Sequence, residues 1–139
     1  MAKITGIHHI AFIVPELEPA LKFWRDTLGL PLQSVEDVPA QDARIAFLPA
    51  GGGEVELVQP ITTDSGLAKS LQKRGPGIHH VCFEVDDLDA MIGLLKEKGI
   101  RLIGEEPSTE ADGRRMIFVH PASAGGVLVE LYEGVKPSE

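Results

Sequence analysis

GIHHIAF at residues 6–12 and GIHHVCF at residues 77–83 are two nearly identical stretches of this sequence. Both have the length and the apolar, partly β-branched character of a strand. Each is followed by leucines and other apolar residues at helical spacing, in residues 16–30 and 86–100. The repeated order of strand and helix predicts two copies of one module.

The two helical segments carry similar signals. The first repeats Leu17, Leu21, Trp24 and Leu28 at helical spacing and places Gly29 where a C-terminal cap is expected. The corresponding positions of the second segment are Leu88, Met91, Ile92, Leu95 and Gly99, after a possible N-cap at Asp86 or Asp87. Both segments therefore predict amphipathic helices.

The similarity continues downstream, where VELVQP at residues 55–60 is echoed by VELYEG at residues 129–134, each after a glycine-rich turn. The predicted strands lie near residues 6–14, 32–37, 43–48, 54–59, 77–85, 101–104, 115–120 and 127–133. We therefore expect an α+β fold in which residues 1–139 form one domain. Its two βαβββ modules, about 5–62 and 76–134, are joined by a short capped helix within residues 64–77.

Composition limits the class of protein. With 139 residues, of which 43% are hydrophobic and 24% charged, the chain is typical of one soluble globular domain. A net charge of −8 argues against a nucleic-acid partner, and no run of about 18 apolar residues indicates a membrane span. The only cysteine, Cys82, cannot form an internal disulfide, and the first residues lack a secretory signal. We expect a cytoplasmic or organelle-matrix protein.

Alternation along a strand separates the paired histidines. His8 shares a face with Phe12 and Val14, and this bulky apolar face is expected to pack against the helix. His9 then lies on the opposite, smaller and more polar face together with Ala11. The same alternation in the second module places His80 on the equivalent face.

Alternation also separates Glu56 and Glu130 from their apolar neighbours, so each module presents one histidine and one glutamate on its less apolar face. A single strand histidine or glutamate is usually only hydrogen-bonded or solvated. The recurrence of both in register favours a site for a divalent metal with His9, Glu56, His80 and Glu130 as ligands, which leaves positions for water or substrate. We interpret His8 and His79 as supporting residues and Cys82 as a small core residue.

These residues and several longer phrases resemble the vicinal oxygen chelate superfamily, and within it the methylmalonyl-CoA epimerases. The phrases are IHHIAF, VELVQP, DSGLAKSLQKRGPGIHHVCFEVDDLDA, KGIRLIGEEP and FVHPASAGGVLVEL. The resemblance implies two βαβββ units in a curved mixed sheet around a metal-binding cleft, a homodimer, and metal ligands at His9, Glu56, His80 and Glu130. The metal would be cobalt, nickel, manganese or zinc, among which the sequence does not choose.

The resemblance implies an isomerase that interconverts (R)- and (S)-methylmalonyl-CoA through a metal-stabilised enediolate, removing and returning the α-proton. Glu130 is the candidate acid/base on one face, with Glu56 or a water on the other. Some epimerases carry another acid/base glutamate where this chain has Ile45, which cannot transfer a proton. The candidate cations for the CoA phosphates are Lys69, Lys73, Arg74, Arg114 and Arg115.

Two other functions remain open, and a third is argued against by the ligand set. A lactoylglutathione lyase of the glyoxalase I type would use the same ligand types. A dioxygenase is less compatible, because Glu56 would fill a position that oxygen or substrate needs. A metal-free ligand-sequestering protein of the same fold would have little reason to keep four ligands.

Overall fold

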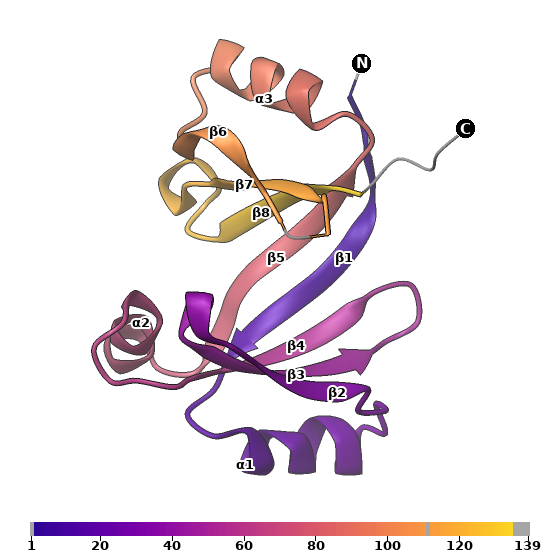
Figure 1. The fold of residues 1–139 in the computed structure, drawn as a ribbon, viewed down its shortest axis with the longest axis vertical. Coiled ribbons are helices and arrows are strands. Elements are labelled where there is room, and N and C mark those ends of the chain that lie inside the picture. Colours follow the sequence, from indigo (N-terminus) through magenta and orange to yellow (C-terminus); the bar gives the residue numbers. More distant parts are fainter. Residues whose placement is uncertain (1, 111, 135–139) are drawn as a thin grey trace. The chain divides into compact units, whose positions relative to one another are not determined.

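The computed structural model describes residues 2–110 and 112–134 and repeats the order strand, helix, three strands (Figure 1). The first half contains β1 (Ile4–Ile13), α1 (Leu17–Leu21), the π-helical η1 (Lys22–Thr27), β2 (Ser34–Val38), the 3₁₀ turn η2 (Pro39–Gln41), β3 (Ala43–Pro49) and β4 (Glu54–Pro60). After α2 (Gly66–Arg74), the second half contains β5 (Gly77–Val85), α3 (Leu88–Glu97), β6 (Leu102–Thr109), β7 (Arg115–Val119), the 3₁₀ turn η3 (Pro121–Ser123) and β8 (Leu128–Glu133). The predicted βαβββ repeat is confirmed.

The eight strands follow the order β2-β3-β4-β1-β5-β8-β7-β6. β1 pairs with β4, and β5 with β8, in parallel, while the outer strands of each half pair antiparallel. The predicted mixed sheet of an α+β fold is therefore confirmed. The chain forms two compact units, which we name the N-terminal unit (His9–His79) and the C-terminal unit (Met1–His8 with His80–Glu139).

The N-terminal unit has its main core between α1 and one face of its strands (Figure 1). Val14, Leu17 and Leu57 are buried there, and the ring of Phe12 lies 4.7 Å from that of Trp24. The prediction that the bulky face of β1 meets the helix is confirmed for Phe12 and Val14.

The C-terminal unit repeats this arrangement with α3. Val85, Leu88 and Ile92 are buried against Ile117 and Leu131 of the strands. Asp87 is the N-cap, since its side chain accepts a hydrogen bond from the Ala90 amide. The sequence offered Asp86 and Asp87 as candidates for this N-cap, and the structure identifies Asp87.

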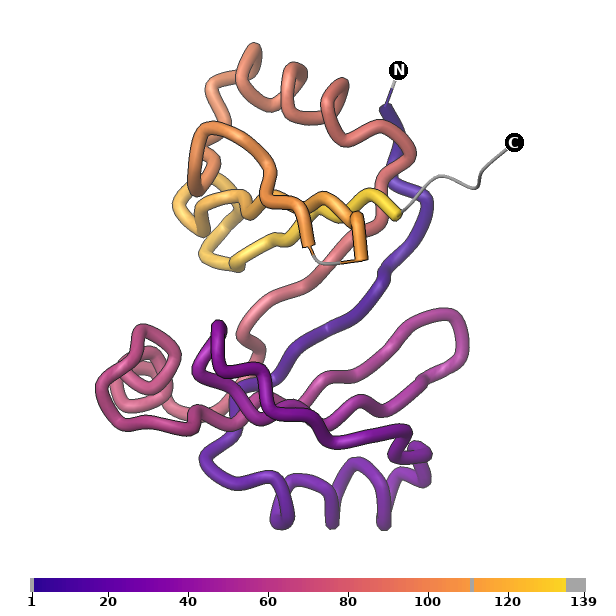
Figure 2. The backbone as a smooth tube through the Cα atoms, in the orientation of Figure 1, coloured from indigo at the N-terminus to yellow at the C-terminus, as the bar shows by residue number. Residues whose placement is uncertain are grey.

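The predicted first helix differs from the structure in its second half. The coil continues from α1 through η1, as the backbone in Figure 2 shows, but η1 is a π-helix in which the Leu28 amide bonds to the Phe23 carbonyl. A π turn holds an extra residue, so the side chains beyond it are rotated off the α-helical face. Leu28 is accordingly 55% exposed, and Leu30 packs against the core instead.

β6 is longer than the predicted strand at residues 101–104. It pairs with β7 through Leu102 and Ile103, then again through Ser108 and Thr109 after a shift in register. Gly104 has a φ of +90°, which favours glycine, at the start of this irregularity. The second part lacks apolar alternation, so the sequence pattern did not predict it.

The predicted helix between the halves is α2. Its N-cap is Ser65, whose hydroxyl accepts a hydrogen bond from the Ala68 amide at 3.0 Å. Among the described residues the longest helix, α3, has 10 residues, and none is long and apolar enough to cross a membrane.

Candidate metal centre and active site

The N-terminal unit brings His9 and Glu56 together. Nδ1 of His9 lies 3.2 Å from Oε2 of Glu56, and the two side chains are only 9% and 11% exposed. β1 and β4 run parallel, and Ala11 of β1 lies beside Glu56 of β4. His9 is two residues before Ala11 and therefore lies on the same face as Ala11 and Glu56. The neighbouring Leu57 points to the α1 side, as the alternation predicted.

The C-terminal unit contains the equivalent pair. Nε2 of His80 lies 3.2 Å from Oε1 of Glu130, with side chains 13% and 11% exposed. Cys82 stands beside Glu130 in the parallel pairing of β5 with β8, as Ala11 stands beside Glu56. The two halves therefore build the same imidazole–carboxylate pair with the same register.

A phenylalanine accompanies each pair. Phe47 on β3 is the cross-strand partner of Glu56, and Phe118 on β7 is the partner of Glu130. The Phe118 ring meets the His80 ring edge-on, with centroids 5.9 Å apart. This repeat of aromatic residues was not predicted from the sequence. Aligning the predicted strand that precedes each glutamate strand in the two modules would have revealed it.

The face that carries His9 is less polar than predicted. Ala11, Ala43, Ile45 and Val58 form a second buried cluster there, and Leu67 of α2 packs against it. The prediction of a smaller face is correct, but α2 covers part of it, and a strand pattern alone does not show where a later helix packs. Ile45 is 5% exposed and is a core residue of this cluster.

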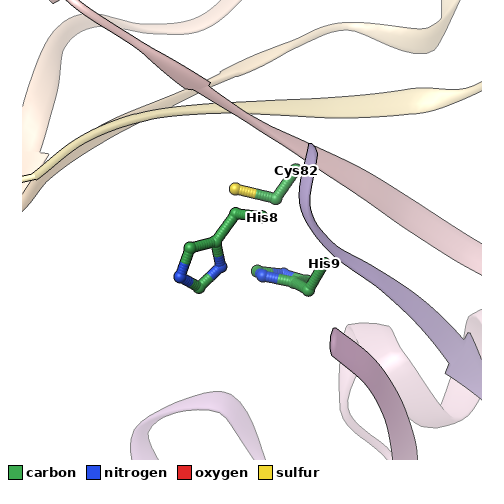
Figure 3. Close-up of side chains that lie close together, drawn as sticks. All are labelled: His8, His9 and Cys82. Atoms are coloured by element: carbon green, nitrogen blue, oxygen red, sulfur yellow. The ribbon is translucent and has the colours of Figure 1, made fainter. Parts of the chain in front are cut away.

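His8 lies in other surroundings than those predicted. In the C-terminal unit its ring lies 4.7 Å from that of Tyr132, and one of its nitrogens lies within 4.8 Å of the Cys82 sulfur (Figure 3). Tyr132 and Cys82 share a face with Glu130, so His8 also faces this side in its unit. The prediction that His8 lies with Phe12 on the helix side is wrong, because β1 contributes residues 4–8 to one unit and 9–13 to the other.

The candidate phosphate-binding cations have different surroundings. Lys69, Lys73 and Arg74 are exposed on α2. Arg115 is tied to Asp89 of α3, with Nη2 and Oδ1 2.6 Å apart, whereas the Arg114 guanidinium lies 5.0 Å from the centre of the Tyr132 ring. The two adjacent arginines are distinguished by these contacts in the structure and not by their residue type.

The chemistry of the four side chains fits a divalent metal. Imidazole nitrogens and carboxylate oxygens are the donors that borderline and harder divalent ions prefer, including the four predicted metals. Each donor is largely shielded from water in its own unit.

The chain matches the model of the glyoxalase, bleomycin resistance protein and dioxygenase superfamily over residues 8–118. It belongs to this superfamily. The matched region includes His9, Glu56 and His80, and ends before Glu130.

Several similar proteins are methylmalonyl-CoA epimerases. The chain is 41% identical over 130 residues to the mitochondrial methylmalonyl-CoA epimerase of Mus musculus, covering 93% of this chain and 73% of that protein. The methylmalonyl-CoA epimerase of Mycobacterium tuberculosis has a similar structure, with a TM-score of 0.83, 38% identity and coverage of 96% and 90% of the two chains. A methylmalonyl-CoA epimerase solved in complex with methylmalonyl-CoA and NH4+ gives a TM-score of 0.82 at 32% identity, with 96% of each chain covered. The predicted resemblance to the epimerases is confirmed.

Proposed function

We propose that this protein is a metal-dependent epimerase that interconverts (R)- and (S)-methylmalonyl-CoA. The observation that carries the proposal is the repeated pair, His9 with Glu56 and His80 with Glu130, at equivalent positions of two modules. The identity to epimerases over nearly the whole chain supports the choice of substrate.

We propose further that both pairs bind one divalent ion. When bound, this ion would act as a Lewis acid and stabilise the negative charge on the substrate oxygens after the α-proton has been removed. Its four protein ligands would be His9, Glu56, His80 and Glu130. The residues of the protein would orient the thioester and transfer the proton.

The proton transfer is assigned to the carboxylates. Epimerisation needs one group that removes the α-proton from one face of the substrate and another that returns it on the other face. Glu130 is the proposed acid/base on one face, and Glu56 or a water acts on the other. Phe118 packs edge-on against the ring of His80.

Ile45 has no role in this scheme. Its side chain is buried among Ala11, Ala43 and Val58, and it offers no titratable atom. An epimerase built on this chain therefore depends on the two remaining carboxylates or on water for both proton transfers.

We propose a homodimer as the assembly. Large apolar side chains are exposed on the N-terminal half of β1, where Ile4 is 52% and Ile7 is 49% exposed. Covering such residues favours self-association. Sedimentation equilibrium will give twice the chain mass if the proposal holds and the chain mass if it does not.

Hydrogen exchange tests the reaction directly. Methylmalonyl-CoA is incubated with the protein in D2O, with added Co²⁺ or Mn²⁺ or with a chelator, and loss of the α-proton is followed by NMR. We expect metal-dependent exchange in the wild type and a fall of about 10²- to 10⁴-fold in Glu130→Gln, which loses an acid/base group.

The matched control is Glu133→Gln, because Glu133 lies on the same strand but points to α3. It should exchange at the wild-type rate. Equal activity of Glu130→Gln and wild type at equal metal content would remove Glu130 from the chemistry. Turnover of the glutathione hemithioacetal of an α-ketoaldehyde without exchange of methylmalonyl-CoA would replace the proposed function by the lyase.

A further inference from the structure

The face of the C-terminal unit that carries His80 and Glu130 extends toward Arg114. On β7, Ile117 and Val119 belong to the core against α3, so the alternate residue Phe118 points to the other side, beside Glu130. Two residues earlier, Met116 is the partner of Tyr132. Arg114 precedes Met116 by two residues and continues this row.

Contacts hold Arg114 in this position. Its guanidinium carbon lies 5.0 Å from the centre of the Tyr132 ring, a cation–π arrangement, and its Nε lies 2.6 Å from Oδ2 of Asp112. The centre of the Tyr132 ring also lies 4.7 Å from that of the His8 ring. Burial lowers the pKa of Arg114, but Tyr132 and Asp112 outweigh it and leave this pKa raised, so the group stays charged.

Arg115 has different surroundings, although it is the next residue. Both of its terminal nitrogens bond to Asp89 of α3, at 2.6 and 3.1 Å, and one lies 3.6 Å from Glu133. Its charge is therefore balanced on the helix side of the sheet, away from the face of Glu130.

The equivalent row in the N-terminal unit contains no cation. Register places Ala43 and Ile45 of β3 opposite Pro60 and Val58 of β4. In the C-terminal unit, Met116 of β7 pairs with Tyr132, and Arg114, just before β7, lies against the Tyr132 ring. Ala43, Ile45 and Val58 are all buried and apolar. The repeat thus conserves the histidine–glutamate pair but gives only the C-terminal unit a charged, aromatic flank.

We propose that Arg114 is the specificity residue that binds an anionic group of the substrate, and that Tyr132 positions it. The proposal rests on the epimerase function proposed above. A guanidinium presents a planar fork that fits a carboxylate or a phosphate, and both groups occur in an acyl-CoA of a dicarboxylic acid. A fixed cation also offsets the repulsion between such a substrate and a chain of net charge −8.

The test compares Arg114→Gln, Arg114→Lys and the matched control Arg115→Gln. Affinity is measured by equilibrium dialysis of methylmalonyl-CoA, and KM and kcat by α-proton exchange. We expect Arg114→Gln to weaken affinity and raise KM by about 10- to 100-fold, as for a lost charge-assisted hydrogen bond, with a smaller change in kcat. Arg114→Lys should fall between, and Arg115→Gln should bind like the wild type.

Two further ligands identify the anionic group. Propionyl-CoA keeps the CoA phosphates without the free carboxylate, and the pantetheine thioester of methylmalonate keeps the carboxylate without any phosphate. A penalty in Arg114→Gln confined to the pantetheine thioester assigns Arg114 to the carboxylate, and one confined to propionyl-CoA assigns it to a phosphate.

Equal binding by Arg114→Gln and wild type, or equal losses in Arg114→Gln and Arg115→Gln, would overturn the proposal. Circular dichroism and thermal melting of each variant separate lost contacts from lost folding. Wild-type protein that binds the ligands without exchanging the α-proton would refute the epimerase function while leaving the role of Arg114 measurable by dialysis.

Discussion

The carboxylate of Glu133 accepts a hydrogen bond from the backbone amide of Leu88 at 3.0 Å, which joins the last strand of the second half to the first turn of its helix. Gln59 does the same for Leu17 in the first half, at 2.9 Å. Both residues lie three positions after the site glutamate, Glu56 or Glu130. The strand that carries each of the two proposed ligands Glu56 and Glu130 is therefore anchored to the helix on its opposite face.

This relationship predicts the effects of substitutions at Glu133. Glu133→Ala leaves a helix N-terminal amide without its acceptor and should lower the free energy of unfolding by about 1 kcal/mol. Glu133→Gln keeps an acceptor, as Gln59 shows, and should cost less than about 0.5 kcal/mol, since the contact with Arg115 is partly exposed. Urea unfolding measures both changes.

The first half provides the comparison. Gln59→Ala should lose as much stability as Glu133→Ala, and Gln59→Glu should lose little. A Glu133→Gln variant that is as unstable as Glu133→Ala would show that charge, rather than the hydrogen bond to Leu88, matters at this position.

Ile45 should behave as a core residue and not as a proton donor. Ile45→Val removes one buried methylene group and should lower the free energy of unfolding by about 1 kcal/mol, with kcat unchanged within about twofold. Leu48→Val is the control, because Leu48 is fully buried on the α1 face of the same strand. A fall in kcat that appears only in Ile45→Val, without lost stability, would contradict this role.

Asp42 should make the stability of the folded protein depend on pH in the acidic range. This residue has a φ of +54° and accepts hydrogen bonds from the Thr62 amide and hydroxyl, both at 2.9 Å. A hydrogen bond from Ser65 is the main cause of its lowered pKa, followed by those from Thr62. The folded state therefore binds the proton less readily than the unfolded state, and the stabilisation is lost as pH falls below the ordinary carboxyl range of about 4.

Asp42→Asn and Asp42→Ala test this point. Asn tolerates the left-handed backbone, so Asp42→Asn should melt above Asp42→Ala at neutral pH. The difference between the wild type and Asp42→Asn should shrink as pH is lowered from 7 to about 3. A difference in melting temperature that stays constant over this range would show that the Asp42 charge does not contribute.

The elements that the sequence predicted well are those with strong local patterns. The repeated GIHH strands, the paired VEL strands and the Asp87 cap are each defined by a few adjacent residues. The π turn at residues 22–27 and the second part of β6 were missed, because Leu28 keeps α-helical spacing and Gly104–Thr109 has no apolar alternation. Local patterns do not report an inserted residue in a turn or a shift in pairing.

In the candidate site, too, the features that depend on local patterns were predicted and those that depend on the tertiary arrangement were missed. Strand alternation correctly placed Glu56 and Glu130 away from their apolar neighbours, and each lies 3.2 Å from the predicted histidine of its unit. The predicted surroundings were wrong for His8, which contacts Tyr132 of the C-terminal unit rather than the core against α1. Alternation also did not separate Arg114 from Arg115, since that required knowing which side of β7 meets α3.

If the two equivalent pairs bind one ion, as proposed, the amount of metal bound per chain should depend on both pairs. Protein stripped with a chelator is dialysed against Co²⁺ or Mn²⁺, and the bound metal is measured for the wild type, His9→Ala, His80→Ala and the control His120→Ala. His120 is a suitable control because it caps η3 and is not one of the four proposed ligands.

We predict one ion per chain in the wild type and in His120→Ala, and loss of that ion in both His9→Ala and His80→Ala, because each removes one of four ligands from a single site. Two ions per chain in the wild type, or one ion retained with unchanged affinity after loss of either histidine, would contradict the shared site.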